Sequence, residues 1–169
     1  MCYAQQVLFF NSLMTGEGMA LFRKRQPASQ AKQASEADVR QRSKSAIAEI
    51  RAFDEGFSAN AFYREVEEKA EHIMLSRETE DINEVATCDL TPVLGKYGVI
   101  VDFNVMESTL TGFYVKDGMQ HAQVVVEALI AIRRIKRPDS KKIKMILHMA
   151  KPANPSPDDE WKIAGLAMK

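Results

Sequence analysis

An apolar corner between two helices constrains the fold of this chain more than any other feature of its sequence. Phe53 and Phe57 bracket a short charged turn, in which Gly56 can adopt a left-handed conformation. Ser58 follows directly, and its hydroxyl can accept a hydrogen bond from the free N–H groups of a new helix whose first buried side chain is Phe62. The segment 50–62 therefore predicts that one amphipathic helix docks against the next through an apolar corner rather than through a polar loop.

Two amphipathic helices flank this corner. The first is predicted from Ser35 to about residue 51, because 35–38 resembles a capping box with Asp in place of Glu or Gln. The second is predicted from about 59 to 76. Their apolar faces carry Val39, Ala46, Ile47 and Ile50 in the first helix, and Phe62, Val66, Ala70 and Ile73 in the second.

Shorter elements surround these helices. Residues 26–35 are rich in Gln, Ala and Ser, which predicts a linker before the first helix. A third helix is predicted with Thr79 as its cap and with Ile82, Val85 and Ala86 inside. One further helical turn is predicted with Pro92 at its start and Gly95 at its end.

From about residue 99 the apolar residues change from helical to alternating spacing. Val99, Val101 and Phe103 occupy alternate positions, and 109–115 is β-branched and aromatic. The residues 116–118 supply a hairpin turn, with Gly118 where a positive φ is needed. Two strands are therefore expected on either side of this turn.

The C-terminal third continues the alternation. In the segment 122–132 the even-numbered positions are all Ala, Val or Ile, which fits a curved strand, although 125–132 alone could pass as a buried helix. Four apolar residues, Ile143, Met145, Leu147 and Met149, then alternate with Lys142, Lys144 and His148. Helices followed by antiparallel strands predict the α+β class, with N-terminal helices packed on a twisted antiparallel sheet.

Three features together resemble a known family. The corner reads Ile-x-x-Phe-Asp-x-x-Phe-Ser-x-x-x-Phe from Ile50 to Phe62, a long strand is expected over 120–135, and Trp161-Lys162-Ile163 looks like a closing strand. This arrangement resembles the domain of the mitochondrial inner-membrane translocase subunit 44 family, over roughly residues 45–166. The chain departs from the family pattern at 77–98, where the helical part is abbreviated, and at 152–160.

The resemblance implies both an architecture and a role. The architecture would be a cone similar to that of nuclear transport factor 2, with helices packed in the concave face of the sheet. The family's relatives include proteins that anchor mitochondrial ribosomes to the membrane. The resemblance therefore implies adaptor work on the matrix side of the inner membrane, holding an import motor, a ribosome, or a respiratory or ATP synthase complex.

Length and composition favour one domain. At 169 residues and 46% hydrophobic content the chain can bury one core. We expect a single α+β domain over 35–169, preceded by an arm or targeting segment over 1–34. Cys2 and Cys88 lie far apart without a Cys-x-x-Cys pattern, so the sequence supports neither a disulfide framework nor a zinc site and fits a reducing compartment. No apolar run approaches the ~18–20 residues of a membrane-spanning helix, so any membrane association is expected to be peripheral.

The N-terminal segment combines apolar side chains with a late basic triplet. This profile overlaps that of a mitochondrial transit peptide, yet it also fits a retained arm whose apolar side chains are buried on a partner or an interface. Whether the segment is cleaved stays open. The candidate contact residues are Phe9, Phe10, Leu21, Phe22, Arg23, Lys24 and Arg25.

Basic residues gather where the last two long strands meet. Within 133–144 there are seven cations and one carboxylate, Asp139, and a hairpin would collect them at one tip. Such a tip could contact lipid head groups or the phosphates of ribosomal RNA. A solvated hairpin end, where Lys blunts strand edges, explains the same pattern equally well. The candidate residues are Arg133, Arg134, Lys136, Arg137, Lys141, Lys142 and Lys144.

Catalytic patterns are weak. His121 and His148 lie on expected strands and could meet, with Asp102 or Glu127 orienting one of them, but no Ser or Cys nucleophile signature accompanies them. An alternative to a binding role is a cone-shaped small-molecule-binding protein or enzyme. Its pocket would lie among Phe62, Val66, Val124, Val126, Ile143 and Trp161.

The sequence thus favours a non-enzymatic subunit or scaffold of a membrane-associated assembly. We expect mitochondrial localisation, with a bacterial cytoplasmic or membrane-peripheral protein as the alternative. We expect protein subunits as partners, with an anionic membrane surface or ribosomal RNA as possible further partners. No metal, cofactor or small-molecule substrate is expected.

Overall fold

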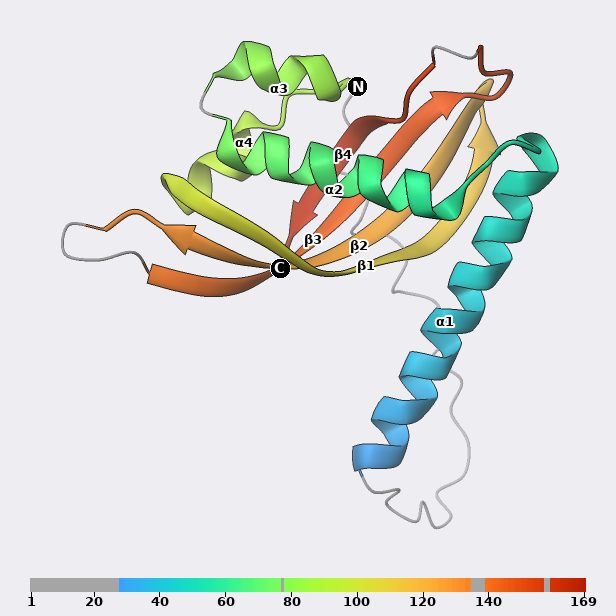
Figure 1. Cartoon of the computed structure of the whole chain (residues 1–169), viewed down its shortest axis with the longest axis horizontal. Helices are drawn as coiled ribbons and strands as arrows, with labels where there is room; N and C mark the ends of the chain where they lie inside the picture. Colours follow the sequence, from blue (N-terminus) through green and yellow to red (C-terminus); the bar gives the residue numbers. More distant parts are fainter. Residues whose placement is uncertain (1–27, 77, 135–138, 157–158) are drawn as a thin grey trace, which may run out of the picture.

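The computed structural model describes residues 28–76, 78–134, 139–156 and 159–169, with side chains in the first helix from residue 37 onward. Figure 1 shows a layer of helices on a single sheet. The helices are α1 (Ala28–Phe53), α2 (Ala59–Leu75), α3 (Thr79–Val85) and α4 (Thr91–Leu94), followed by a 3-10 turn, Gly95–Tyr97. The strands are β1 (Ile100–Lys116), β2 (Met119–Ile132), β3 (Asp139–Pro152) and β4 (Lys162–Met168).

The sheet is an antiparallel meander in the order β1-β2-β3-β4, and it is not closed. Helices precede the strands in the chain, so the prediction of an α+β fold is confirmed. The α2 helix runs across one face of the sheet, which we call the inner face, and α3 lies beyond it (Figure 1). The opposite face is called the outer face.

Alternate residues of the long strands form the core on the inner face. In β2 every even-numbered residue from Gln120 to Ile132 is buried, as the spacing predicted for a strand. Phe62 of α2 packs against Trp161, with ring centroids 5.3 Å apart and planes at 71°. This edge-to-face contact closes the core between the helix and the segment before β4.

The corner between α1 and α2 is largely as predicted. Ser58 caps α2 by accepting a hydrogen bond from the Ala61 N–H at 3.4 Å, and Phe57 and Phe62 are buried. Phe53, by contrast, is 55% exposed and leans on Phe113 at 6.0 Å. The prediction for Gly56 was wrong, because its φ is not positive; instead its N–H donates to Asp54 Oδ1 at 3.1 Å, which closes the turn.

The α1 helix begins earlier than predicted. It starts at Ala28 and continues through Ser35, so the capping box does not begin a helix there and 28–35 is not a linker. The segment 28–35 consists of Ala, Gln, Lys and Ser, and the first three of these residue types favour helix over an irregular linker. In α3 the predicted cap is also displaced by one residue, because Glu78 holds the cap position and Thr79 is the first helical residue.

The start of β1 also differs from the alternation in the sequence. Val99 and Val101 are 42% and 39% exposed, whereas Ile100 and Phe103 are buried. The pairing with β2 shifts by one residue between Ile100 and Asp102, and such a bulge moves side chains to the other face. The hairpin turn after β1 is as predicted, with φ of 52° at Asp117 and 75° at Gly118.

Only the C-terminal half of α1 packs on the domain. Ala46 and Ile50 are buried, but the described residues 37–42 are all exposed. Figure 1 shows α1 leaving the sheet and projecting away from it. Val39 belongs to the same apolar stripe as Ala46 and Ile50, yet it is not buried against the sheet and is 37% exposed.

Candidate functional site

The described part of the basic cluster lies at one end of the sheet. Arg133 and Arg134 follow β2, and the Arg133 N–H donates to Val99 O at 2.8 Å, which holds the chain beside the start of β1. Lys141, Lys142 and Lys144 lie on β3, and all five side chains are exposed. We call these five residues the basic end. Lys136 and Arg137, predicted with them, lie outside the described residues.

Ion pairs organise the basic end. On the outer face, Glu127 Oε2 lies 2.6 Å from Lys142 Nζ, and Glu127 Oε1 lies 3.2 Å from Lys144 Nζ. Hydrogen bonds from Lys142 and then Lys144 hold the pKa of Glu127 below its usual value. Arg134 lies 3.9 Å from Asp139. The basic end thus has five cations against two carboxylates, and it keeps a net positive charge.

Lys141 points the other way. Its Nζ lies 5.7 Å from the centre of the Tyr97 ring on the side of the helices. The basic end therefore presents charge on both faces of the same hairpin, because neighbouring residues of a strand point to opposite faces.

A groove lies between the projecting half of α1 and the sheet, where it follows the β1 edge and extends over the outer face. It has a volume of about 870 Å³ and is bordered by α1 on one side and by β1, β2 and β3 on the other. We call it the α1–β1 groove. Its charged lining residues are Arg40, Lys44, Glu107, Glu127, Lys142 and Lys144. The two lysines of β3 thus belong both to the groove and to the basic end.

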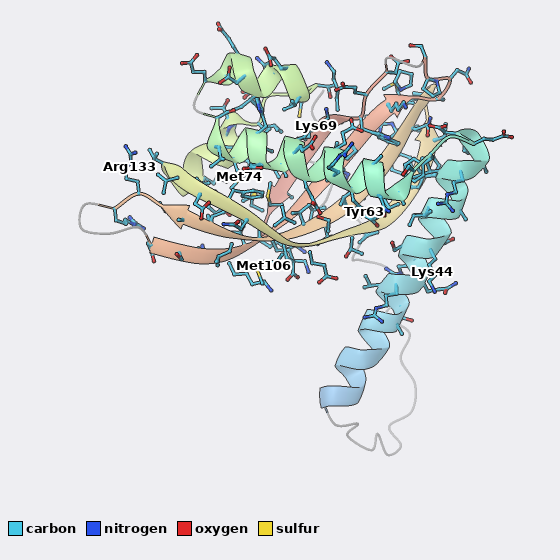
Figure 2. The ribbon with its side chains drawn as sticks, in the orientation of Figure 1. Lys44, Tyr63, Lys69, Met74, Met106 and Arg133 are labelled. Atoms are coloured by element: carbon cyan, nitrogen blue, oxygen red, sulfur yellow. The ribbon has the colours of Figure 1, made fainter. Side chains whose placement is uncertain are left out.

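Tyr63 joins three elements beside this groove. Its hydroxyl accepts a hydrogen bond from the Leu110 N–H of β1 at 3.1 Å and lies 3.3 Å from Ser43 Oγ of α1. Figure 2 shows Tyr63 below α2, close to the strands, and Lys44 on the projecting helix. Ser108, which also lines the groove, has a buried Oγ atom without a hydrogen-bond partner in the described residues.

The two candidate histidines lie on the outer face. His121 stacks on Tyr114, with ring centroids 4.7 Å apart, and His148 packs against Gly165. Burial lowers the pKa of both imidazoles, and the nearby His121 lowers that of His148 further. The carboxylates expected to orient them are engaged elsewhere, because Glu127 binds two lysines and Asp102 accepts a hydrogen bond from Asn104.

The residues of the alternative pocket are core residues. Phe62, Val66, Val124, Val126, Ile143 and Trp161 are each at most 4% exposed, and none of them lines the α1–β1 groove. In the described residues no group of three His, Cys, Asp or Glu side chains could hold a metal ion.

Acidic side chains gather away from the basic end. A hollow of about 640 Å³ between α2 and α3 is lined by Glu68, Glu71, Glu78 and Asp81 together with His72. Among the described residues, carboxylates therefore gather between α2 and α3, and cations gather at the basic end of the sheet.

Sequence reasoning missed the contribution of α1 and the ion pairs of Glu127. Arg40 and Lys44 are four residues apart, which places them on one face of a helix, but nothing local indicates that this face meets β1. The predicted contact residues of the arm, Phe9, Phe10, Leu21, Phe22, Arg23, Lys24 and Arg25, lie outside the described residues.

Comparisons with known proteins leave the family open. No family model matches the chain, and no curated protein matches its sequence. Among the described helices, none combines the length and the apolar character that crossing a membrane requires.

Proposed function

We propose that this protein is a non-enzymatic subunit or scaffold of a membrane-associated assembly, and that it attaches through the basic end to anionic lipid head groups. The observation that carries the proposal is the exposure of five cations at one end of the sheet against two carboxylates. Each Lys or Arg near an anionic bilayer contributes on the order of 1 kcal/mol, so such a cluster is sufficient for reversible attachment.

The residues at the basic end favour lipid over single-stranded nucleic acid. At the basic end Lys141 lies over the ring of Tyr97, at a distance at which cation and ring attract each other. Single-stranded nucleic acid is usually bound by several aromatic rings on which successive bases stack. Charge without a row of exposed rings is better suited to head groups than to bases.

The proposed location follows from the resemblance to the translocase subunit 44 family, which implies the matrix side of the mitochondrial inner membrane. In that setting the partners would be protein subunits of an import motor, a ribosome, or a respiratory or ATP synthase complex. No cofactor is proposed. A non-enzymatic role is supported by the carboxylates Glu127 and Asp102, whose partners are lysines and Asn104 rather than the two histidines.

Liposome flotation tests the proposal. Arg133, Arg134 and Lys141 would be replaced together by Gln, and binding to vesicles with and without cardiolipin would be measured at two salt concentrations. Wild-type protein should float with cardiolipin vesicles and less so at high salt, because salt screens exposed charges. The variant should float much less.

A matched variant controls for total charge. Arg42, Arg51 and Lys162 are also exposed and lie away from the basic end, and their replacement by Gln removes the same charge. This control should float as wild type does. Equal flotation of the two triple variants would contradict the proposal, and wild-type binding to ribosomal RNA in preference to vesicles would assign the basic end to RNA instead.

A further inference from the structure

The β1 strand has an open edge along the α1–β1 groove. Within the described residues β1 pairs with β2 alone, so its other side carries backbone groups without a sheet partner. The Leu110 N–H is one of these groups, because it donates to the Tyr63 hydroxyl rather than to β2. Alternate residues of a strand direct their backbone groups to the same side, so the N–H and C=O of Ser108 also point away from β2, and Ser108 is one of the residues that line the groove.

The stretch of β1 beside the groove is regular. Glu107, Ser108, Thr109 and Leu110 pair in sequence with Glu127, Val126, Val125 and Val124, and the pairing shifts only before and after this stretch. Bulges commonly protect sheet edges from unwanted pairing. Here the shifts lie on either side of 107–110, so the stretch that carries most of the β1 residues of the groove stays regular, and Thr111 of the groove lies at the second shift.

The α1 helix keeps the space beside this edge open. Val39, Arg40, Ser43 and Lys44 of α1 face Glu107, Ser108 and Thr109 of β1 across a groove of about 870 Å³. Tyr63 fixes the separation at one end, because its hydroxyl contacts both Ser43 and the Leu110 N–H. A groove of this volume lies within the ~300–1,000 Å³ range of ligand sites.

The charges of the groove indicate the chemistry of its occupant. Four cations, Arg40, Lys44, Lys142 and Lys144, line it together with the carboxylates Glu107 and Glu127. Glu127 already has two lysine partners, so the α1 cations Arg40 and Lys44 are the charges best placed to meet an incoming group. Glu107 at the β1 edge would repel a continuous row of phosphates, whereas a polypeptide can alternate acidic and apolar side chains.

We propose that the α1–β1 groove binds an extended, acidic segment of a partner polypeptide, which adds as a further strand to the edge of β1. Main-chain hydrogen bonds at Ser108 and at the Leu110 carbonyl would provide register, and acidic side chains would meet Arg40 and Lys44. This inference rests on the proposed role as a subunit and identifies the surface for its protein partner.

Synthetic peptides test the inference directly. A short fluorescent peptide that alternates Glu and Val would be added to the full chain, and binding would be followed by anisotropy. A peptide that alternates Lys and Val has the same propensity for strands and the opposite charge. The acidic peptide should bind and the basic peptide should not, and the Ser108 amide should exchange hydrogen at least about tenfold more slowly with the acidic peptide bound.

Two pairs of charge variants locate the binding. Replacing Arg40 and Lys44 by Gln should weaken binding of the acidic peptide roughly five- to tenfold, since each exposed ion pair typically changes affinity by a few fold. Replacing Arg133 and Arg134 by Gln removes the same charge outside the groove and should leave peptide binding unchanged. Vesicle flotation should be unchanged in the Arg40 and Lys44 variant and reduced in the Arg133 and Arg134 variant. Failure of the groove proposal and failure of the lipid proposal are therefore distinguishable.

A proline variant tests strand addition itself. Ser108→Pro removes an N–H that points away from β2, and proline is tolerated at such edge positions, so the circular dichroism spectrum should be unchanged while peptide binding is lost. If this variant does not fold, slower hydrogen exchange of the Ser108 amide in wild type with the acidic peptide bound tests strand addition instead. Absence of binding by the acidic peptide, equal binding of both peptides, or binding without protection of Ser108 would each overturn the inference.

Discussion

The two faces of the sheet differ in what covers them, although they are built from alternate residues of the same strands. On the inner face Val124, Val126 and Leu147 are fully buried beneath the helices. On the outer face Leu129 is 43% exposed, and Glu127 is held by two lysines. The side chains of the inner face therefore stabilise the fold, whereas those of the outer face and its edges are accessible to other molecules.

Neighbouring residues of β3 give the sharpest test of this difference. Leu147→Ala on the inner face should lower the free energy of unfolding by about 2–5 kcal/mol, because it leaves a cavity in a closed core. Ile146→Ala on the outer face should lower it much less, because Ile146 is only half-buried and solvent can fill the space. Urea melts of both variants measure the difference. Similar losses would show that the outer face is as tightly packed as the inner one.

A second test concerns a buried cation in the helical layer. Lys69 Nζ lies 3.0 Å from Glu160 Oε2 and 3.4 Å from Glu65 Oε1, and its side chain is 10% exposed (Figure 2). Lys69→Met should destabilise the fold by about 1–2 kcal/mol. This is less than the ~3–5 kcal/mol expected when a fully buried partner is left alone, because Glu160 is 69% exposed and regains water.

The matched change for Lys69 is Glu160→Gln, which keeps a hydrogen-bond acceptor and removes the charge. It should cost less than Lys69→Met in the same melts. A Lys69→Met variant at least as stable as wild type would mean that this ion pair does not hold the segment before β4 to α2.

The smallest expected effect is a pH dependence on the outer face. Burial lowers the pKa of His148 and of His121 in the folded state, so the unfolded chain takes up protons first as the pH falls. Stability should therefore be complete above the unfolded pKa of about 6.5 and should decline as the pH falls below it. Denaturant melts between pH 7.5 and 5.5 measure the decline, which should be shallower in His148→Gln. An unchanged slope would show that His148 does not cause it.

The strands could be predicted from sequence because their side chains report the two faces directly. In β2 and β3 each buried residue is followed by a less buried one over most of the strand, so the pattern and the structure agree. At Val99 and Val101 the pattern failed, because a bulge depends on how β1 pairs with β2 and not on local composition. The start of α1 was missed for a related reason, since a cap signal at Ser35 does not show whether a helix is already formed before it.

The candidate site was predicted only in part. The cations of the basic end are close in sequence and could be recognised as a cluster. The α1–β1 groove combines Arg40 with Ser108 and Lys144, which come together only through the docking of α1 at the corner and the pairing of three strands. No local sequence pattern connects such distant positions. Nor does the sequence indicate that Glu127 pairs with Lys142 and Lys144 and so neutralises part of the charge of the basic end.

The closure of α2 against the end of the chain has a consequence for the lifetime of the folded state. Lys69 and Glu160 are 91 positions apart, and the contact between Glu65 and the Trp161 N–H spans 96. The β1–β2 hairpin, by contrast, is joined by a two-residue turn, so its contacts can form early while those of α2 must wait. Interactions that form after the folding transition state mainly slow unfolding. We therefore expect the contacts of Lys69 and Trp161 to form late in folding. Removing them should speed unfolding while the rate of folding stays nearly constant.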